Sequence, residues 1–142
     1  MKKKILYMVR FFSGLHSSLE KGIWDPEGVP TIYKIMEGLD KSKFEVEFIL
    51  SNYNLFTSAR FDKFHTKREL KNFRSKFHVL SVGSDNIWFV RKIKNIIFFF
   101  KKYLFLINCI RRFQPDLVYI DRAHIIEGAI IKNFFNCKFF CE

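Results

Sequence analysis

Short apolar runs alternate with helical patterns along this chain of 142 residues, and the alternation limits the fold more than any other feature. We interpret five apolar runs as strands, at residues 4–11, 44–50, 77–82, 116–121 and 137–141. The spacing of apolar residues predicts helices at about 28–39, 60–74, 86–113 and 123–135, whereas residues 12–27 are typical of a polar loop. Because parallel strands need such crossovers, we expect one α/β domain, a Rossmann-like parallel sheet with helices on both faces.

The first residues imitate a secretory signal peptide, because three lysines precede an apolar run. That run ends at Arg10 after only five residues, whereas an export signal needs about 7–15 and a small-residue cleavage site. We therefore interpret the segment as the first strand and expect a cytoplasmic protein.

The three cysteines, Cys109, Cys137 and Cys141, form no CxxC pair, and no further ligands at zinc-site spacing lie near them. This pattern indicates neither a disulfide framework nor a metal site. We expect buried free thiols in a reducing compartment, and we expect no metal and no cofactor.

Most of the net charge of +11 belongs to one segment of the chain. Residues 86–113 contain seven basic residues and no acid. On a helix that turns about 100° per residue, five of these cations share an arc of roughly 100°, with aromatic residues among them. The set that we expect at a membrane surface is Arg91, Lys94, Phe98, Lys101, Lys102, Phe105 and Arg112.

This basic segment does not fit a membrane-spanning helix, which needs about 20 apolar residues, because Lys101 and Lys102 interrupt it centrally. A helix in the interface of an anionic membrane fits, and so does a core helix with a solvated basic edge. We do not expect nucleic acid as the partner, because the sequence has no recognised nucleic-acid motif. The membrane interpretation places the protein peripherally at the inner face of the plasma membrane.

Ligands of doubly wound sheets bind at the carboxyl ends of the strands, so the loops there are the first candidates for a site. The loop after the first strand contains Ser13, Gly14, His16 and Gly28, and it leads into a helix N-terminus whose free N–H groups can cradle a phosphate. Its spacing is neither that of GxGxxG nor that of a P-loop. An ordinary loop before a helix that begins with proline is the simpler interpretation.

Asp121, Arg122 and His124 follow the fourth predicted strand. A carboxylate, a guanidinium and an imidazole at a strand end can orient a sugar hydroxyl or a phosphate, and His16 can join them from the first loop. A helix cap by Asp121 beside an exposed Arg122 is the plainer alternative. The other two histidines have incidental positions.

Four segments resemble, in order and spacing, the N-terminal domain of family 4 glycosyltransferases. Residues 3–14, 28–36 and 44–49 are similar to its opening strand and loop, its first helix and its second strand. Residues 113–122, FQPDLVYIDR, are similar to its strand that follows a Pro-Asp pair. The resemblance covers nearly the whole chain and implies half of a GT-B fold, in which two Rossmann-like domains form the active site in the cleft between them.

In that family the N-terminal domain recognises the acceptor and rests on the membrane, whereas a C-terminal domain binds the nucleotide-sugar. We therefore expect residues 1–142 to be one truncated N-terminal domain without its donor-binding partner. The resemblance implies that Gly14 and Gly28 approach the donor diphosphate. With this interpretation, we expect Asp121 and His124 at the strand end to be catalytic and Arg122 to bind substrate.

The expected function is the acceptor half of a retaining glycosyltransferase that moves a sugar from a nucleotide-sugar to a polysaccharide or lipid-linked acceptor. We expect this half to be inactive alone. One alternative is a non-catalytic membrane-binding subunit that recruits a separate donor-binding chain. Another is a nucleotide-binding regulatory domain.

Overall fold

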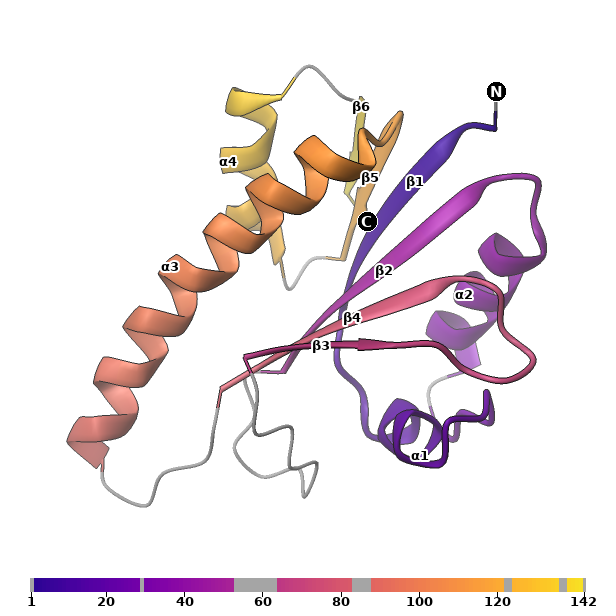
Figure 1. Ribbon diagram of the computed structural model, residues 1–142, viewed down its shortest axis with the longest axis horizontal. Helices are drawn as coiled ribbons and strands as arrows, with labels where there is room; N and C mark the ends of the chain where they lie inside the picture. The colour runs from indigo at the N-terminus through magenta and orange to yellow at the C-terminus, as the bar shows by residue number, and fades with distance from the viewer. Residues whose placement is uncertain are drawn as a thin grey trace.

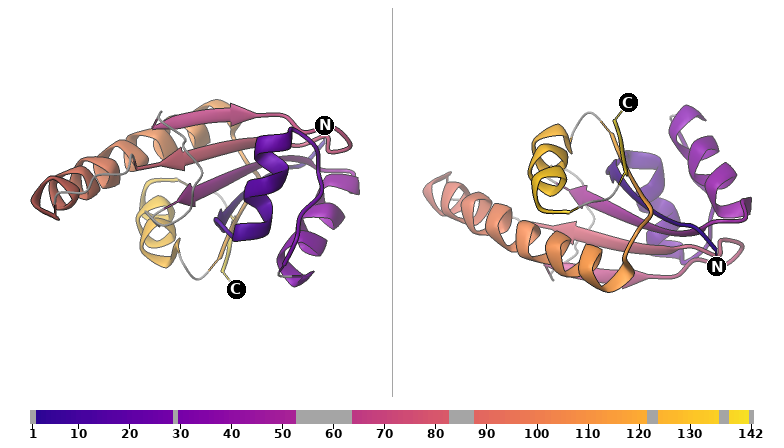
Figure 2. Two further views of the ribbon diagram at one scale, coloured as in Figure 1. Left: turned by 90° about the horizontal axis from the view of Figure 1, so that it is seen from below. Right: turned by 90° about the horizontal axis from the view of Figure 1, so that it is seen from above.

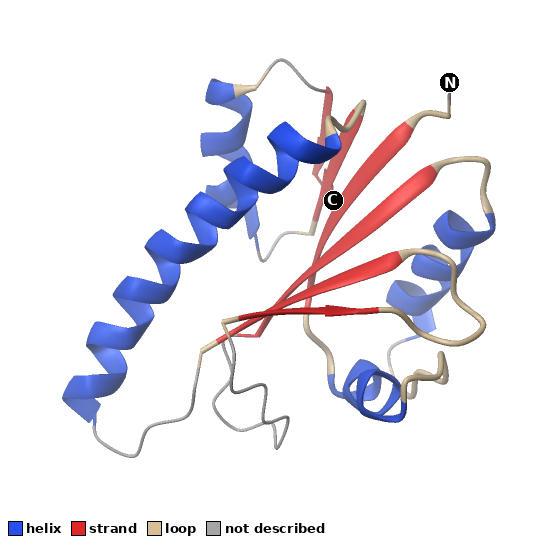
Figure 3. Ribbon diagram, in the orientation of Figure 1, coloured by secondary structure: helices blue, strands red, loops and turns tan. Residues whose placement is uncertain are grey.

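The computed structural model describes residues 2–28, 30–52, 64–82, 88–121, 124–135 and 138–141, which form an α/β fold (Figure 1). The strands are β1 (Lys4–Arg10), β2 (Glu45–Asn52), β3 (His65–Arg68), β4 (Lys76–Ser81), β5 (Leu117–Ile120) and β6 (Lys138–Cys141). The helices are α1 (Ser13–Lys21), α2 (Pro30–Lys41), α3 (Trp88–Phe113) and α4 (Ile125–Phe134). The strands build one sheet in the order β3-β4-β2-β1-β5-β6, in which β3 is antiparallel and the other pairings are parallel (Figure 3). The predicted Rossmann-like α/β class is confirmed.

The described helices cover both faces of the sheet, with α1 and α2 on one side and α3 and α4 on the other (Figure 2). β1 lies in the middle of the sheet and is buried from Ile5 to Val9. Because successive side chains of a strand point to opposite faces, Tyr7 contributes to the core under α1 and α2, and Leu6 and Met8 to the core under α3 and α4. A strand covered on both faces reads as a continuous apolar run, which is why the sequence predicted it.

The prediction of a polar loop at residues 12–27 was wrong, because α1 begins at Ser13 and ends at Lys21. Leu15 and Leu19 stand four residues apart and both are buried against the sheet, so one narrow apolar stripe stabilises the helix. Gly22 ends it with a φ of 68°, in the left-handed region that favours glycine.

The predicted helix at 60–74 was also wrong for its described residues, 64–74. His65–Arg68 instead forms β3, which pairs with β4 from His65 opposite Leu80 to Arg68 opposite Phe77. The following segment returns under α2, where Leu70 and Phe73 are buried. A short polar strand at the sheet edge has no periodicity of its own, because its pairing partner determines its conformation.

α3 crosses back over the sheet from the end of β4 to the start of β5, as predicted. Its C-terminal half packs on the sheet through Leu106, Cys109, Ile110 and Phe113. Its N-terminal half extends away from the strands (Figure 1), and residues 92–97 are all exposed. Among the described residues, no helix is long and apolar enough to cross a membrane.

Candidate functional site

The candidate site lies where the direction of strand addition reverses. From β1 the sheet grows through β2 and β4 in one direction, and after α3 it continues on the other side of β1 with β5 and β6. The carboxyl ends of β1 and β5 are therefore neighbours at the edge where parallel sheets of this kind bind ligands. The loops that the sequence singled out after residues 11 and 120 both start there.

An ion pair joins these two strand ends. Arg10 Nε lies 3.2 Å from Asp121 Oδ2, and the Asp121 backbone N–H donates to the Met8 carbonyl at 3.0 Å. The Arg10 side chain is 60% exposed, whereas that of Asp121 is only 14% exposed. Asp121 is thus held in place while its partner can turn toward a ligand. Arg10 was not among the predicted site residues, and Arg122 lies outside the described residues.

Two helices begin at this edge without a side-chain cap. Phe12 caps α1 and His124 caps α4, and neither side chain makes a capping hydrogen bond to its helix. The first turn of α1 also contains no acid. Free N–H groups and the positive end of the helix dipole favour an anion, so this end of α1 suits a phosphate or a carboxylate.

Gly14 stands in that first turn, and packing alone requires it to be glycine. A Cβ on Gly14 would lie 1.3 Å from the carbonyl oxygen of Glu27, whose N–H donates to the Gly14 carbonyl at 3.4 Å. Gly28 follows with a φ of 96°. The two glycines therefore shape the approach of residues 22–28 to α1, and their expected contact with a diphosphate stays a prediction.

His16 and Ser13 belong to α1 rather than to a loop. His16 Nδ1 lies 3.4 Å from Glu20 Oε2 on the next turn, and its ring meets the ring of Phe11 edge to face. The side chain of Ser13 lies outside what the structure describes.

His124 lies in the interior, where it is 1% exposed. Its Nδ1 is 3.7 Å from Glu127 Oε1, and Lys102 Nζ donates to the same oxygen. Burial alone would raise the pKa of Glu127, but the neighbouring His124 imidazole together with the hydrogen bond and charge of Lys102 lower it to about 2. Burial lowers the pKa of Lys102, and Glu127 opposes that change. The structure thus brings His124 close to α3 and covers it.

The predicted membrane-facing set is only partly at the surface. Lys102 is fully buried and Phe98 is 4% exposed, so both predictions were wrong. Phe105 is half-buried against His65 and Phe64, so its prediction was wrong as well. Lys94, Lys101 and Arg112 are exposed, as predicted, whereas the side chain of Arg91 lies outside the described part of the chain.

Helix α3 exposes a different apolar face, which we call the α3 stripe. Its members are Phe89, Ile93, Ile96, Ile97, Phe100 and Leu104, each at least 43% exposed. At about 100° per residue they fall within an arc of roughly 100°, with Lys94, Lys101 and Arg112 along one side of it. Surface apolar residues are normally scattered, and a continuous stripe with a basic border marks an interaction surface.

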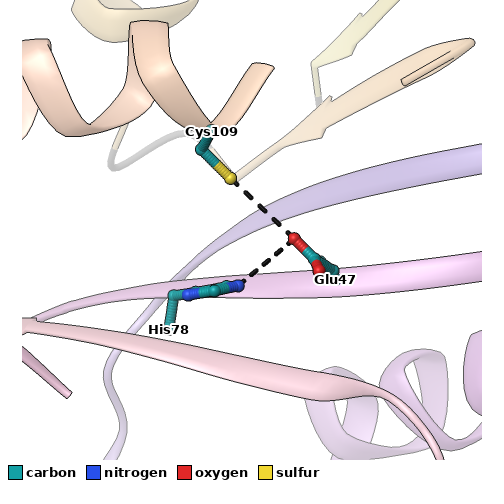
Figure 4. A group of neighbouring side chains, drawn as sticks. All are labelled: Glu47, His78 and Cys109. Carbon is teal, nitrogen blue, oxygen red and sulfur yellow. Dashed lines mark hydrogen bonds and ion pairs between the residues drawn. The ribbon is translucent and has the colours of Figure 1, made fainter. Parts of the chain in front are cut away.

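A buried polar cluster between the sheet and α3 was missed by the sequence prediction. Glu47 of β2, His78 of β4 and Cys109 of α3 point toward one another (Figure 4). The sequence signal was a glutamate inside the apolar run 44–50. The prediction that Cys109 is a buried free thiol is confirmed.

A cavity of about 420 Å³ lies at the opposite, amino edge of the sheet. Lys4, Phe44, Asp116 and Lys138 line it, and the Lys4 backbone N–H donates to Asp116 Oδ2 at 2.7 Å. Parallel sheets bind ligands at the carboxyl edge, so we place the candidate site there and not in this cavity.

Comparison with known protein families gave no match, and comparisons with curated proteins and with solved structures gave none either. The likeness to family 4 glycosyltransferases therefore depends on the sequence segments described above.

Proposed function

We propose that this chain is the acceptor-side domain of a retaining, GT-B-type glycosyltransferase similar to family 4. It acts with a donor-binding domain to move a sugar from a nucleotide-sugar to a polysaccharide or lipid-linked acceptor at an anionic membrane surface. The observation that carries the proposal is that two features share one edge of the sheet. Arg10 and Asp121 meet at the carboxyl ends of β1 and β5, and α3, whose residues 92–97 are exposed, is the next described element of the chain after the carboxyl end of β4.

The chemistry of this edge suits a sugar and a phosphate. The Asp121 carboxylate can accept a hydrogen bond from a sugar hydroxyl, and the Arg10 guanidinium can hold a phosphate oxygen. The uncapped start of α1 offers N–H groups to the same anion. These groups position substrates, and the donor-binding domain supplies the remaining contacts, so we expect no sugar transfer by the purified chain.

The α3 stripe supplies the membrane contact. Its apolar side chains can enter the acyl boundary while Lys94 and Lys101 remain among anionic headgroups. Such cations contribute about 1 kcal/mol each near a charged leaflet. A lipid-linked acceptor in the same leaflet would then lie near the edge that holds Asp121.

Vesicle sedimentation tests the membrane part. We expect the chain to bind phosphatidylglycerol-containing vesicles, and we expect Lys94→Glu with Lys101→Glu to weaken binding by at least roughly 30-fold. Phe100→Glu, inside the α3 stripe, should weaken it as well. Matched controls at the opposite edge are Lys41→Glu with Lys43→Glu and Phe44→Glu, which should bind like the wild type. Equal losses in controls and stripe variants, or no binding by the wild type, would contradict the proposal.

Ligand-observed NMR tests the sugar part. With a lipid-linked saccharide in nanodiscs, we expect saturation transfer to the saccharide and a loss of that signal in Asp121→Asn. A chain that binds vesicles but gives no saccharide signal would instead be the membrane-binding subunit that recruits a separate donor-binding chain. Tight binding of a free mononucleotide would favour a regulatory domain, because the acceptor half should bind nucleotide weakly.

A further inference from the structure

Three side chains with different donor atoms converge in the core between the sheet and α3. His78 Nε2 lies 3.2 Å from Glu47 Oε2, and Cys109 Sγ lies 3.9 Å from the same oxygen. One donor atom from each residue can be chosen so that all three lie within 4.8 Å of one another (Figure 4). The residues are far apart in sequence and come from β2, β4 and α3, so the fold itself assembles the group.

The spacing of these atoms is close to that of a tetrahedral zinc site. With Zn–N and Zn–O near 2.0–2.1 Å and Zn–S near 2.3 Å, two ligand atoms lie about 3.3–3.6 Å apart. The Glu47–His78 distance of 3.2 Å is close to this range, and the Cys109 sulfur, 3.9 Å from Glu47 Oε2, would have to move a few tenths of an ångström closer. One carboxylate oxygen, one imidazole nitrogen and one thiolate sulfur form a mixed donor set that suits zinc and not magnesium or calcium.

A second layer of contacts holds the histidine. His78 Nδ1 lies 3.0 Å from His65 Nε2, and the tilted ring of Phe105 contacts both imidazoles. A zinc-bound histidine needs such a partner for its other nitrogen, since that partner fixes the ring and its tautomer. His65 therefore has the position of an outer partner to His78.

The guanidinium of Arg112 forms an ion pair with the Glu47 carboxylate. Its guanidinium NH2 lies 3.6 Å from Glu47 Oε2, and its side chain is 66% exposed. A long exposed side chain can swing into solvent and open a path to the carboxylate. A bound cation and this guanidinium would compete for the same oxygen.

We propose that Glu47, His78 and Cys109 form a zinc site that is gated by Arg112 and leaves one coordination position for water. On binding, the S–H bond of Cys109 breaks as the S–Zn bond forms, and the proton leaves to solvent. His78 binds through the lone pair of Nε2 and carries its proton on Nδ1, from which it donates to His65. The thiolate and the Glu47 carboxylate together balance the two positive charges of the metal. This proposal does not depend on the proposed glycosyltransferase function.

Cobalt titration of the purified, chelator-treated chain tests the site. We expect one equivalent of Co²⁺ to give tetrahedral d–d bands and a thiolate-to-cobalt charge-transfer band, both removed by one equivalent of Zn²⁺. Cys109→Ser should abolish the charge-transfer band, whereas the matched variant Cys141→Ser should keep it. His65→Ala should weaken binding about 10–100-fold, as loss of an outer partner does.

Arg112→Gln separates a metal site from an ordinary buried hydrogen-bond cluster. The variant changes an exposed side chain, so we expect it to fold, and removal of the competing cation should tighten cobalt binding. Weaker binding in this variant, or no charge-transfer band in the wild type, would overturn the proposal. A band that survives Cys109→Ser and disappears in Cys141→Ser would assign the metal to the edge cysteine and overturn it too. Circular dichroism of each variant shows whether a lost band reflects a lost fold.

Discussion

The buried ion pair between Lys102 and Glu127 offers the most direct test of how α3 packs against the rest of the domain. Lys102 is fully buried, Glu127 is 5% exposed, and Lys102 Nζ donates to Glu127 Oε1. Lys102→Met keeps the length and apolar stem of the side chain but removes its charge. The Glu127 carboxylate would then remain in the core with His124 as its described neighbour.

Removal of one partner from a buried ion pair costs about 3–5 kcal/mol, because the other charge stays desolvated. Two features move the expected value to the lower end of that range. His124 lies 3.7 Å from the carboxylate, and Glu127 stands in the first turn of α4, where the helix dipole favours a negative charge. We therefore expect a loss of about 3 kcal/mol in the free energy of unfolding, or roughly 10 °C in Tm.

Chemical denaturation of four proteins measures this effect: the wild type, Lys102→Met, Glu127→Leu and the double variant. The double variant should return to within about 1 kcal/mol of the wild type, since an apolar pair can replace a buried ion pair. Lys101→Met, one residue away and exposed, is the matched control and should change stability by less than about 0.5 kcal/mol. A Lys102→Met protein as stable as the Lys101→Met protein would refute the placement of Lys102 in the core.

Three further outcomes follow from other contacts. Glu127 has a pKa of about 2 in the fold against an ordinary 4.5. Its ionised form should therefore contribute fully to the free energy of unfolding above about pH 4.5, and this contribution should be lost as the pH falls toward 2. Glu127→Gln should flatten that part of a stability–pH profile. Gly14→Ala should lower the free energy of unfolding by about 1–3 kcal/mol, because the new Cβ would lie 1.3 Å from the Glu27 carbonyl oxygen. Asp40→Ala should cost about 2–3 kcal/mol by denaturation, because Oδ1 accepts from two backbone N–H groups and the Ser75 hydroxyl, and Asp40→Asn should recover part of the loss.

The parallel core of the fold was predictable because each central strand is buried on both faces. Residues 5–9 are continuously apolar and residues 77–82 are apolar except for His78 and Ser81, and a sheet covered on both sides accounts for such runs. α1 and β3 could not be found in the same way. α1 has one narrow apolar stripe in nine residues, and β3, with the sequence HTKR, is a strand only because β4 pairs with it.

The edge that carries the candidate site was predictable, but the contacts within it were not. Periodicity placed Asp121 at the carboxyl end of a strand, and the topology rule for parallel sheets pointed to that edge. The structure adds that this strand, β5, lies next to β1. No local pattern pairs Asp121 with Arg10, because the two residues lie on different strands. The cluster of Glu47, His78 and Cys109 was unpredictable for the same reason, since His78 and Cys109 are 31 and 62 residues from Glu47 in the sequence. Metal-site spacing rules, which look for neighbouring ligands, could not detect it.

The most consequential error of the sequence prediction concerned the rotation of α3 about its own axis, which decides which side chains are exposed. Five of the seven cations in this segment share one arc, and from the sequence alone that arc was expected to face a membrane. Lys102 belongs to the arc but is drawn into the core by Glu127, which lies 25 residues later in another helix. Because Phe98 stands one turn before Lys102 on the same side of the helix, the rotation that buries Lys102 buries Phe98 as well. The opposite face, with Ile96 and Phe100, is thereby left exposed.

The Lys102–Glu127 pair thus lies outside the α3 stripe, but it is placed to set the rotation of α3 and so the direction in which the α3 stripe faces. If it fixes the rotation of α3, its loss should change vesicle binding even where the chain stays folded. In the Lys102→Met, Glu127→Leu double variant, apolar contacts hold the helix without a directional bond. We expect this variant to be as stable as the wild type but to bind anionic vesicles more weakly, because the α3 stripe is no longer held toward the lipid. Unchanged binding by a stable double variant would show that sheet packing alone sets the rotation.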